Sequence, residues 1–301
     1  MTIIDALGDR DLFGRLARFR NLATWAAWLV FLKAVFALPM RDTEFAVFAT
    51  HTGRTIPPQA EADEAAAIVG RRGGKSFIVA ALATFLAFFA DWRRHVAPGE
   101  RVYVVVIAQN LRAARVLLNY IRGFLHQIPA FAREILRERA DEIDLAIGVT
   151  IGVWPCTFRA VRGLTIGVAI CDEIDFWWQE SVNAALEVIA AIRPAMASLP
   201  GAKLIVISSP YTPVGWLAQF HQAYWGQDQS TKLVWQAPSL VMNPTLDPAK
   251  IQAAIAEDPD RARAEWEAVW RTGVSAFLDP ALVDACTRRE PRVLPPMRWP
   301  A

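Results

Sequence analysis

The residues best suited to chemistry form one short stretch, Gly70 to Ser76, which reads Gly-Arg-Arg-Gly-Gly-Lys-Ser. A short apolar run precedes it and a longer one follows, the order expected of a strand, a tight loop and a helix. Glycines let the loop backbone bring its N–H groups close to phosphate oxygens, and the positive end of the helix adds to that field. Lys75 would reach the β- and γ-phosphates of ATP, and the Ser76 hydroxyl would bind Mg²⁺. The predicted nucleotide contacts in this loop are Gly70, Arg72, Gly73, Gly74, Lys75 and Ser76.

The loop departs from the common G-x-x-x-x-G-K-[ST] pattern in two ways. Val69 stands where the first glycine is expected, with a glycine following at position 70, and two arginines lie inside the loop. By itself the stretch also suits a glycine-rich turn with basic residues before a buried helix. The nucleotide interpretation therefore needs a second motif.

An acidic pair supplies that motif. A run of small and apolar residues from Gly167 to Cys171 predicts a strand, and Asp172 and Glu173 follow it directly. Asp172 would hold Mg²⁺ through water, and Glu173 would orient and deprotonate the attacking water. A glutamate beside the aspartate favours attack by water on the γ-phosphate over transfer to a small molecule. Together the two motifs predict a Mg²⁺-dependent nucleoside triphosphatase.

A third motif ends another apolar run. Lys203 to Ile207 reads as a buried strand, and Ser208, Ser209 and Pro210 follow it. Hydroxyl groups at such a strand end, beside the γ-phosphate, would sense whether that phosphate is present and pass the signal on. An ordinary Ser-Pro turn is the alternative.

The segment upstream of the phosphate loop, Arg41 to Ala62, reads as a turn-rich loop. Many motor ATPases hold the adenine at this position, so Arg54 and Gln59 are predicted base contacts. A surface loop without a ligand fits the same residues.

Apolar patterning predicts the elements that position these groups. The run Arg101 to Ala108 is rich in β-branched residues, which indicates a strand buried on both faces, as in parallel sheets. The predicted fold class is α/β, a P-loop NTPase of the RecA-like (ASCE) type, with a mostly parallel central sheet flanked by helices and an N-terminal helical leader. Further strands are expected at 65–69, 143–147, 150–155, 167–171, 203–207 and 231–236. Helices are expected at 1–20, 22–40, 77–92, 110–122, 131–139 and 182–197, and within 212–227 and 248–271.

Composition narrows the classes of protein that fit. With 301 residues, 54% of them apolar, the chain has enough apolar residues for a large core, and its net charge of +2 does not by itself demand nucleic acid. The three cysteines and four histidines show no metal-ligand spacing, so the cysteines are expected to be reduced core residues. The apolar run Leu22 to Met40 carries Lys33 in its middle, which favours a buried or docking helix over a membrane span. We expect a soluble intracellular protein.

Basic residues follow the strand expected at 101–108. Arg115 and Arg122 are interleaved with leucines on the next predicted helix. They would either contact a DNA backbone or form a solvated face.

The order of these motifs resembles the large subunit of tailed-phage terminases, the motor that packages DNA into a procapsid. The resemblance is carried by the arginine-containing phosphate loop, by the stretch Cys171 to Trp177, and by Ser208 to Pro210 on the next strand. A tryptophan-containing leader through Leu38 to Met40 and the loop Thr52 to Thr55 add to it. The resemblance extends over about residues 20–290, most of the chain.

This resemblance implies further roles. Arg71 matches the loop arginine that contacts the γ-phosphate, and the Ser208 to Pro210 segment matches the motif that couples hydrolysis to DNA movement. Arg162 matches the arginine supplied to a neighbouring subunit, with Arg159 as the alternative. The implied partners are double-stranded DNA, the portal protein, the small terminase subunit and further copies of the chain in a ring. The implied location is the procapsid portal in the cytoplasm of the infected bacterial host, with no membrane.

Terminase large subunits usually continue into a nuclease domain. Here Ser275 to Asp279 is followed by a proline-rich end that reads as an interdomain linker, so no DNA cleavage is expected from this chain. The expected divisions are a leader with a nucleotide-proximal loop at 1–60, the ATPase core at 61–240, a helical subregion at 241–278 and the linker at 279–301. The alternatives are a helicase-type DNA motor, which would need a second RecA-like domain, and a nucleotide-gated DNA-binding module without turnover, against which Glu173 argues.

Overall fold

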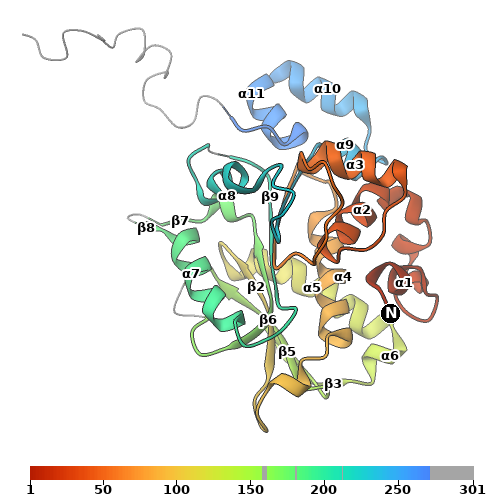
Figure 1. Cartoon of the computed structure of the whole chain (residues 1–301), viewed down its shortest axis with the longest axis vertical. Coiled ribbons are helices and arrows are strands. Elements are labelled where there is room, and N and C mark those ends of the chain that lie inside the picture. Colours follow the sequence, from red (N-terminus) through yellow and green to blue (C-terminus); the bar gives the residue numbers. More distant parts are fainter. Residues whose placement is uncertain (158–160, 180–181, 212, 272–301) are drawn as a thin grey trace, which may run out of the picture.

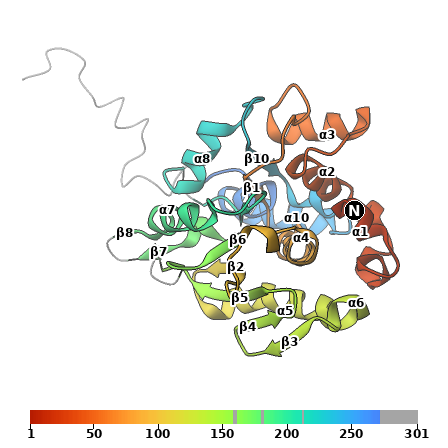
Figure 2. The same cartoon turned by 60° about the horizontal axis from the view of Figure 1, so that its bottom comes forward.

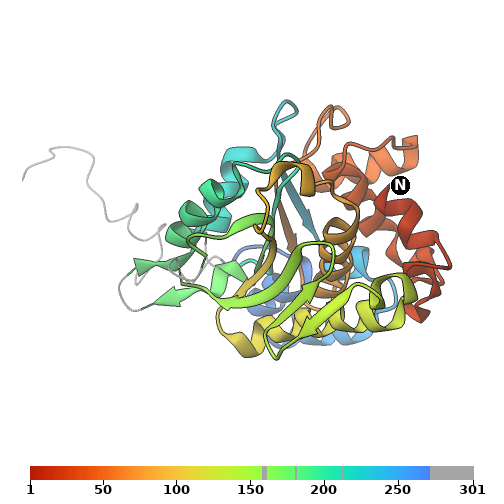
Figure 3. The same ribbon diagram turned by 90° about the horizontal axis from the view of Figure 1, so that it is seen from below.

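The computed structural model describes residues 1–157, 161–179, 182–211 and 213–271. Its main sheet contains β1 (Glu64–Val69), β2 (Val102–Ala108), β3 (Ile135–Glu138), β4 (Glu142–Leu145), β5 (Val149–Pro155), β6 (Thr165–Asp172), β9 (Lys203–Ser208) and β10 (Lys232–Ala237). The helices are α1 (Ile3–Gly8), α2 (Ala26–Val35), α3 (Asp42–Thr52), α4 (Lys75–Phe89), α5 (Leu111–Gln127), α6 (Pro129–Ala132), α7 (Ala184–Met196), α8 (Trp216–Tyr224), α9 (Ser239–Met242), α10 (Pro248–Glu257) and α11 (Pro259–Ala262). Figure 1 shows the sheet between these helices, with α10 and α11 gathered beyond one end of it. β7 (Trp178–Gln179) and β8 (Val182–Asn183) form a separate antiparallel ribbon beside α7. This ribbon projects from the body of the protein in Figure 3.

The strand order is β10-β1-β9-β6-β2-β5-β4-β3, and the neighbours from β10 to β5 are all parallel. Parallel strands end at the same edge of a sheet, which is where α/β proteins bind their ligands. The register places Ile68 of β1 opposite Ser208 of β9, and Asp172 of β6 opposite Ile207 of β9. The three predicted motifs therefore follow three adjacent strands at one edge.

Both faces of the sheet are covered. Alternate strand residues such as Val104 and Ile170 belong to one apolar cluster with α1, α2, α4 and α5, and the intervening residues such as Val105 and Cys171 belong to a second with α7 and α8. Figure 2 shows the two groups of helices on opposite sides of the sheet. This double burial explains the continuous apolar runs in the central strands.

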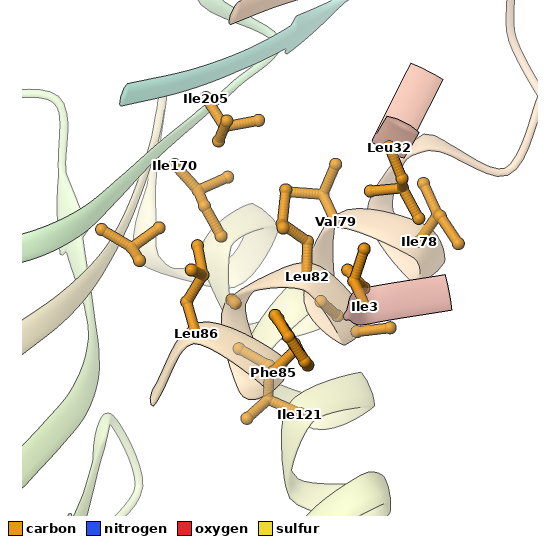
Figure 4. Close-up of a cluster of buried hydrophobic side chains, with 14 of the residues drawn as sticks. Ile3, Leu32, Ile78, Val79, Leu82, Phe85, Leu86, Ile121, Ile170 and Ile205 are labelled. Atoms are coloured by element: carbon orange, nitrogen blue, oxygen red, sulfur yellow. The ribbon is translucent and has the colours of Figure 1, made fainter. Parts of the chain in front are cut away.

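The helix that follows the phosphate loop, α4, is buried on nearly every side. In Figure 4, Val79 and Leu86 lie toward Ile170 of the sheet, and Phe85 lies beside Ile121 of α5. Because sheet, α5 and leader all pack against α4, its sequence is apolar without the polar face of a surface helix. A buried α4 fixes the position of the loop at its amino end.

The predicted strands are present, with ends shifted by at most two residues. The prediction of one helix over residues 1–20 is wrong, because α1 ends at Gly8 and short 3₁₀ turns follow. A Cβ on Gly14 would lie 2.7 Å from the carbonyl oxygen of Gly8, so the chain folds back tightly there.

The loop predicted at 41–62 contains the helix α3. Glu44 accepts a hydrogen bond of 2.9 Å from the Arg41 amide at its start, and Gly53, with a φ of 68°, ends it. This local capping outweighs the turn-forming residues further on.

The helix predicted at 131–139 is also wrong. α6 ends at Ala132, and β3 then pairs with β4, with Ile135 opposite Leu145. Pairing with a strand later in the chain decides the conformation here, which local helix propensity does not report.

The prediction of a buried helix within Leu22 to Met40 is confirmed, and the burial of two of the three cysteines is confirmed as well. No helix within the described ranges is long and apolar enough to cross a membrane, and α2 instead packs in the core with Lys33 paired to Glu44 at 2.7 Å. Cys156 and Cys171 are buried and free, whereas Cys286 lies outside the described residues.

Candidate active site

The phosphate loop joins β1 to α4 at the carboxyl edge of the sheet. Gly74 has a φ of 90°, and Arg72 has a φ of 78°. The left-handed region costs a non-glycine residue about 1–2 kcal/mol, so surrounding contacts must hold Arg72 in place. The first N–H groups of α4 have no acceptor within the helix and are available to an anion.

The structure explains the glycine at position 70 of the loop. A Cβ on Gly70 would lie 2.3 Å from Ser239 Oγ and 2.6 Å from the Trp266 carbonyl oxygen. Val69 is buried, and its Cγ1 lies 2.5 Å from where a Cβ on Gly73 would be. Glycine is thus required at 70 and 73 because neighbouring atoms fill the space.

Three of the predicted residues converge beside the loop. Lys75 Nζ donates to the Val69 carbonyl (2.8 Å) and to Ser209 Oγ (3.1 Å), and lies 3.5 Å from Glu173 Oε1. Lys75 is buried with 7% exposure, whereas the Glu173 side chain is 39% exposed. A buried cation beside an accessible carboxylate suits binding of a phosphate next to a base that water can reach.

Glu173 is held in an uncommon backbone conformation, with a φ of 51° directly after β6. Its Oε2 accepts hydrogen bonds from Ser208 Oγ (3.2 Å) and from the Ser209 amide (3.1 Å). The segment from Ser208 to the buried Pro210 therefore contacts Glu173, and through Ser209 it also contacts Lys75. The structure brings together three motifs that lie far apart in the sequence.

Asp172 lies deeper than Glu173. Burial, followed by the neighbouring Glu173 carboxylate, raises the pKa of Asp172 to about 7, although Lys75 acts in the opposite direction. Two adjacent carboxylates beside one lysine favour an additional cation. Ser76, in the first turn of α4, is the predicted hydroxyl ligand. Residue types at this edge thus fit Mg²⁺, which prefers carboxylate, hydroxyl and phosphate oxygens.

Arg71 contacts the helical subregion after β10. Its amide donates to the Glu265 carbonyl, and its Nη1 lies 3.6 Å from Glu265 Oε1. The Arg71 side chain is 54% exposed and therefore accessible.

Comparison with solved structures identifies the fold. The ATPase domain of the Thermus phage P74-26 large terminase superposes with a TM-score of 0.54 at 15% identity, covering 79% of this chain and 98% of that one. The HK97 bacteriophage large terminase gives 0.57 at 18% identity, and the large terminase of another phage, a thermophilic bacteriophage, gives 0.51 at 13%. The fold is that of a large-terminase ATPase domain.

This chain spans about half of the last two of those proteins. The match to the HK97 terminase covers 83% of this chain and 55% of that protein. The match to the thermophilic bacteriophage terminase covers 82% of this chain and 53% of that protein. No family model and no curated protein matches the sequence. The similarity is therefore one of fold, and the terminase ATPase fold agrees with the predicted RecA-like class.

Within this terminase-type fold, Arg162 lies far from the phosphate loop of its own chain. It is exposed in the turn before Thr165, where β6 begins, whereas the loop and Asp172 lie at the carboxyl edge. The length of β6 separates the two edges by about 23 Å. Arg159, the alternative, is outside the described residues.

Arg54 and Gln59 remain predicted base contacts, and the structure does not bring Arg54 to the phosphate loop. The Arg54 guanidinium is buried and donates to the carbonyls of Ser230 and Lys232, at the amino end of β10. Gln59 donates to the Pro57 carbonyl within the same exposed loop. The Arg54 contacts lie at the edge of the sheet opposite the phosphate loop, because Lys232 is paired with the first residue of β1.

Arg115 and Arg122 of α5 are engaged within the chain. Arg115 binds Asp141 at 2.6 and 3.0 Å, and Arg122 pairs with Glu138 of β3. They brace the antiparallel edge of the sheet, and the proposal that they contact DNA gains no support from these contacts.

Sequence reasoning missed a set of loop contacts. Trp28, Ser239 and Asn243 each donate a hydrogen bond to a loop carbonyl. A lone Ser and Asn so far along the chain from the loop give no local signal of this role.

Proposed function

We propose that this chain is the ATPase motor domain of a viral DNA-packaging terminase, which hydrolyses ATP with Mg²⁺ to move double-stranded DNA into a procapsid. The observation that carries the proposal is the convergence of Lys75, Glu173 and Ser209 at the carboxyl edge of a terminase-type sheet. A P-loop lysine, a carboxylate open to water and a hydroxyl group beside them are the groups that γ-phosphate hydrolysis needs.

In this proposal Lys75 binds the β- and γ-phosphates, replacing the backbone carbonyl that it contacts now. Glu173 takes a proton from the attacking water, and its hydrogen bonds from Ser208 and Ser209 fix the orientation of its carboxylate. Mg²⁺, held by Ser76 and Asp172, would neutralise charge on the phosphates. Arg71 neutralises charge on the γ-phosphate.

The Ser208 to Pro210 segment is suited to coupling. Ser209 Oγ contacts the lysine that binds phosphate, while the Ser209 amide and Ser208 Oγ contact the base. Loss of the γ-phosphate changes the partners of Lys75 and Glu173, and so shifts this segment. We infer that the shift is passed to the rest of the motor and moves DNA.

Arg162 completes the site of a neighbouring copy. Because its own phosphate loop lies at the other edge of the sheet, the nucleotide that Arg162 contacts would be one bound by the next subunit of a homo-oligomeric ring. Such an arginine is typically worth about 10³–10⁵ in rate. The ring would assemble on the portal protein, with the small terminase subunit and double-stranded DNA as further partners, in the cytoplasm of the infected bacterium.

Two substitutions test the proposal. Lys75→Ala should weaken nucleotide binding and abolish Mg²⁺-ATP hydrolysis, whereas Glu173→Ala should bind ATP and fail to hydrolyse it. Binding is measured by titration calorimetry and turnover by phosphate release. Wild-type turnover in Glu173→Ala would show that Glu173 is not the base. Unchanged nucleotide binding in Lys75→Ala would show that the loop is not the phosphate site.

A further inference from the structure

The phosphate loop is held from outside by side chains on its carbonyl oxygens. Trp28 Nε1 donates to the Gly73 carbonyl (2.6 Å), Ser239 Oγ to the Arg71 carbonyl (2.7 Å) and Asn243 Nδ2 to the Arg72 carbonyl (2.9 Å). Trp28 and Ser239 are fully buried.

The carbonyls on either side are engaged as well. Lys75 Nζ binds the Val69 carbonyl, the Gly73 amide binds that of Gly70, and the Ile78 amide binds that of Gly74. Every carbonyl from residue 69 to residue 74 therefore has a donor.

This pattern fixes which way the loop amides face. The Arg71 amide already donates to the Glu265 carbonyl and the Gly73 amide to the Gly70 carbonyl, so the amides that held carbonyls would direct toward an anion are those of Arg72 and Gly74. The strained φ of Arg72 is the point where the backbone reverses, and its carbonyl is the one that Asn243 holds. A strained backbone conformation persists only where surrounding contacts hold it, and the Asn243 donor is one such contact for Arg72.

We propose that Trp28, Ser239 and Asn243, here named the carbonyl clamp, are positioning residues that preset the phosphate loop for nucleotide. This inference rests on the proposed function, because it assigns the clamp to the same nucleotide site. Ser239 is the first residue of α9, and Asn243 directly follows the end of that helix. Because α10 and α11 come next in the chain, the clamp also ties the loop to that helical subregion.

The chain offers closely matched variants. Asn243→Asp keeps the shape of the side chain and its acceptor for the Thr245 hydroxyl (2.6 Å) but removes the donor to Arg72. Thr245→Ala is the control, since it removes that hydroxyl without touching the loop. Ser239→Ala removes the donor to the Arg71 carbonyl, and the smaller alanine side chain fits the same space.

One measurement needs no nucleotide. Trypsin cleaves after arginine, and the bonds after Arg71 and Arg72 carry the two clamped carbonyls. Cleavage after Arg72 should rise about fivefold in Asn243→Asp, and cleavage after Arg71 by a similar factor in Ser239→Ala, since a neutral hydrogen bond is lost in each. Cleavage after the exposed Arg94, and both rates in Thr245→Ala, should match wild type. Equal loop cleavage in all variants would overturn the clamp.

The second measurement is nucleotide affinity. Asn243→Asp and Ser239→Ala should each raise the Kd for both ADP and ATP about threefold to tenfold, because loop amides contact phosphates that the two nucleotides share. Wild-type affinity in these variants, with nucleotide binding by wild type intact, would overturn the clamp alone. If wild type binds neither nucleotide, the proposed function is wrong, and the clamp's role in nucleotide binding is wrong with it.

Discussion

The pairing of Arg71 with Glu265 leads to a prediction about nucleotide preference. Arg71 Nη1 lies 3.6 Å from Glu265 Oε1, and both side chains are partly exposed. If Arg71 contacts the γ-phosphate, it must leave Glu265 when ATP binds. Glu265 then competes with the γ-phosphate of ATP for Arg71, whereas ADP has no γ-phosphate and does not compete. Replacing Glu265 by glutamine removes the competing charge.

The size of the effect follows from the geometry. Two unit charges 3.6 Å apart interact by about 1 kcal/mol in water, and exposed pairs contribute about 0–1 kcal/mol after screening and side-chain ordering. Glu265→Gln is therefore expected to tighten ATP binding by up to about fivefold and leave ADP binding unchanged. The ratio of the two Kd values, measured by titration calorimetry at low ionic strength, reports the effect.

Glu267 supplies a matched control. It lies in the same turn and pairs with Arg263 at 3.8 Å, so Glu267→Gln removes the same charge without touching Arg71. The reasoning is refuted if Glu265→Gln changes the ratio no more than Glu267→Gln does, because a general change of charge would then account for both.

Three further predictions concern the ring, the leader and DNA. Arg162→Ala and Lys75→Ala proteins should each be inactive, yet a mixture should regain ATPase activity where an intact loop sits beside an intact arginine; no recovery in demonstrated rings would exclude a trans role. Burial acts to raise the pKa of Glu44, but hydrogen bonds from the Arg41 amide and from Lys33 outweigh it and lower the pKa to about 2. The contribution of the Glu44 carboxylate to stability is thus complete above about pH 4.5 and is lost as pH falls toward 2. Glu44→Gln should therefore lower the free energy of unfolding, measured in urea, by about 1 kcal/mol at neutral pH and by less near pH 3. An equal loss at both pH values would contradict this. DNA binding, followed by fluorescence anisotropy, should be independent of sequence and fall steeply with salt, and tight salt-insensitive binding would count against a packaging motor.

The sequence carries enough local information to predict the edge of the sheet where the site lies. The glycines and lysine of the loop, the acidic pair at 172–173 and the serines at 208–209 each follow a buried apolar run. Because parallel strands end at the same edge, these patterns are sufficient to predict that the groups lie close together.

Contacts between distant segments were not predictable in this way. Nothing near Arg54 in the sequence indicates that the carbonyls of Ser230 and Lys232 take its guanidinium. The same holds for Ser239 and Asn243, which reach the phosphate loop only because β10 lies beside β1. β3 shows the limit for secondary structure, since its partner strand decides its conformation.

The proposed ATP-driven DNA motor is tested most directly by phosphate release from Mg²⁺-ATP with and without double-stranded DNA. Glu173→Ala serves as the blank, since it lacks the base and keeps every residue of the phosphate loop. We expect wild-type protein to release phosphate well above this blank, and to release it faster when DNA is added. Phosphate release equal to the blank, with DNA present and ATP bound, would contradict the account.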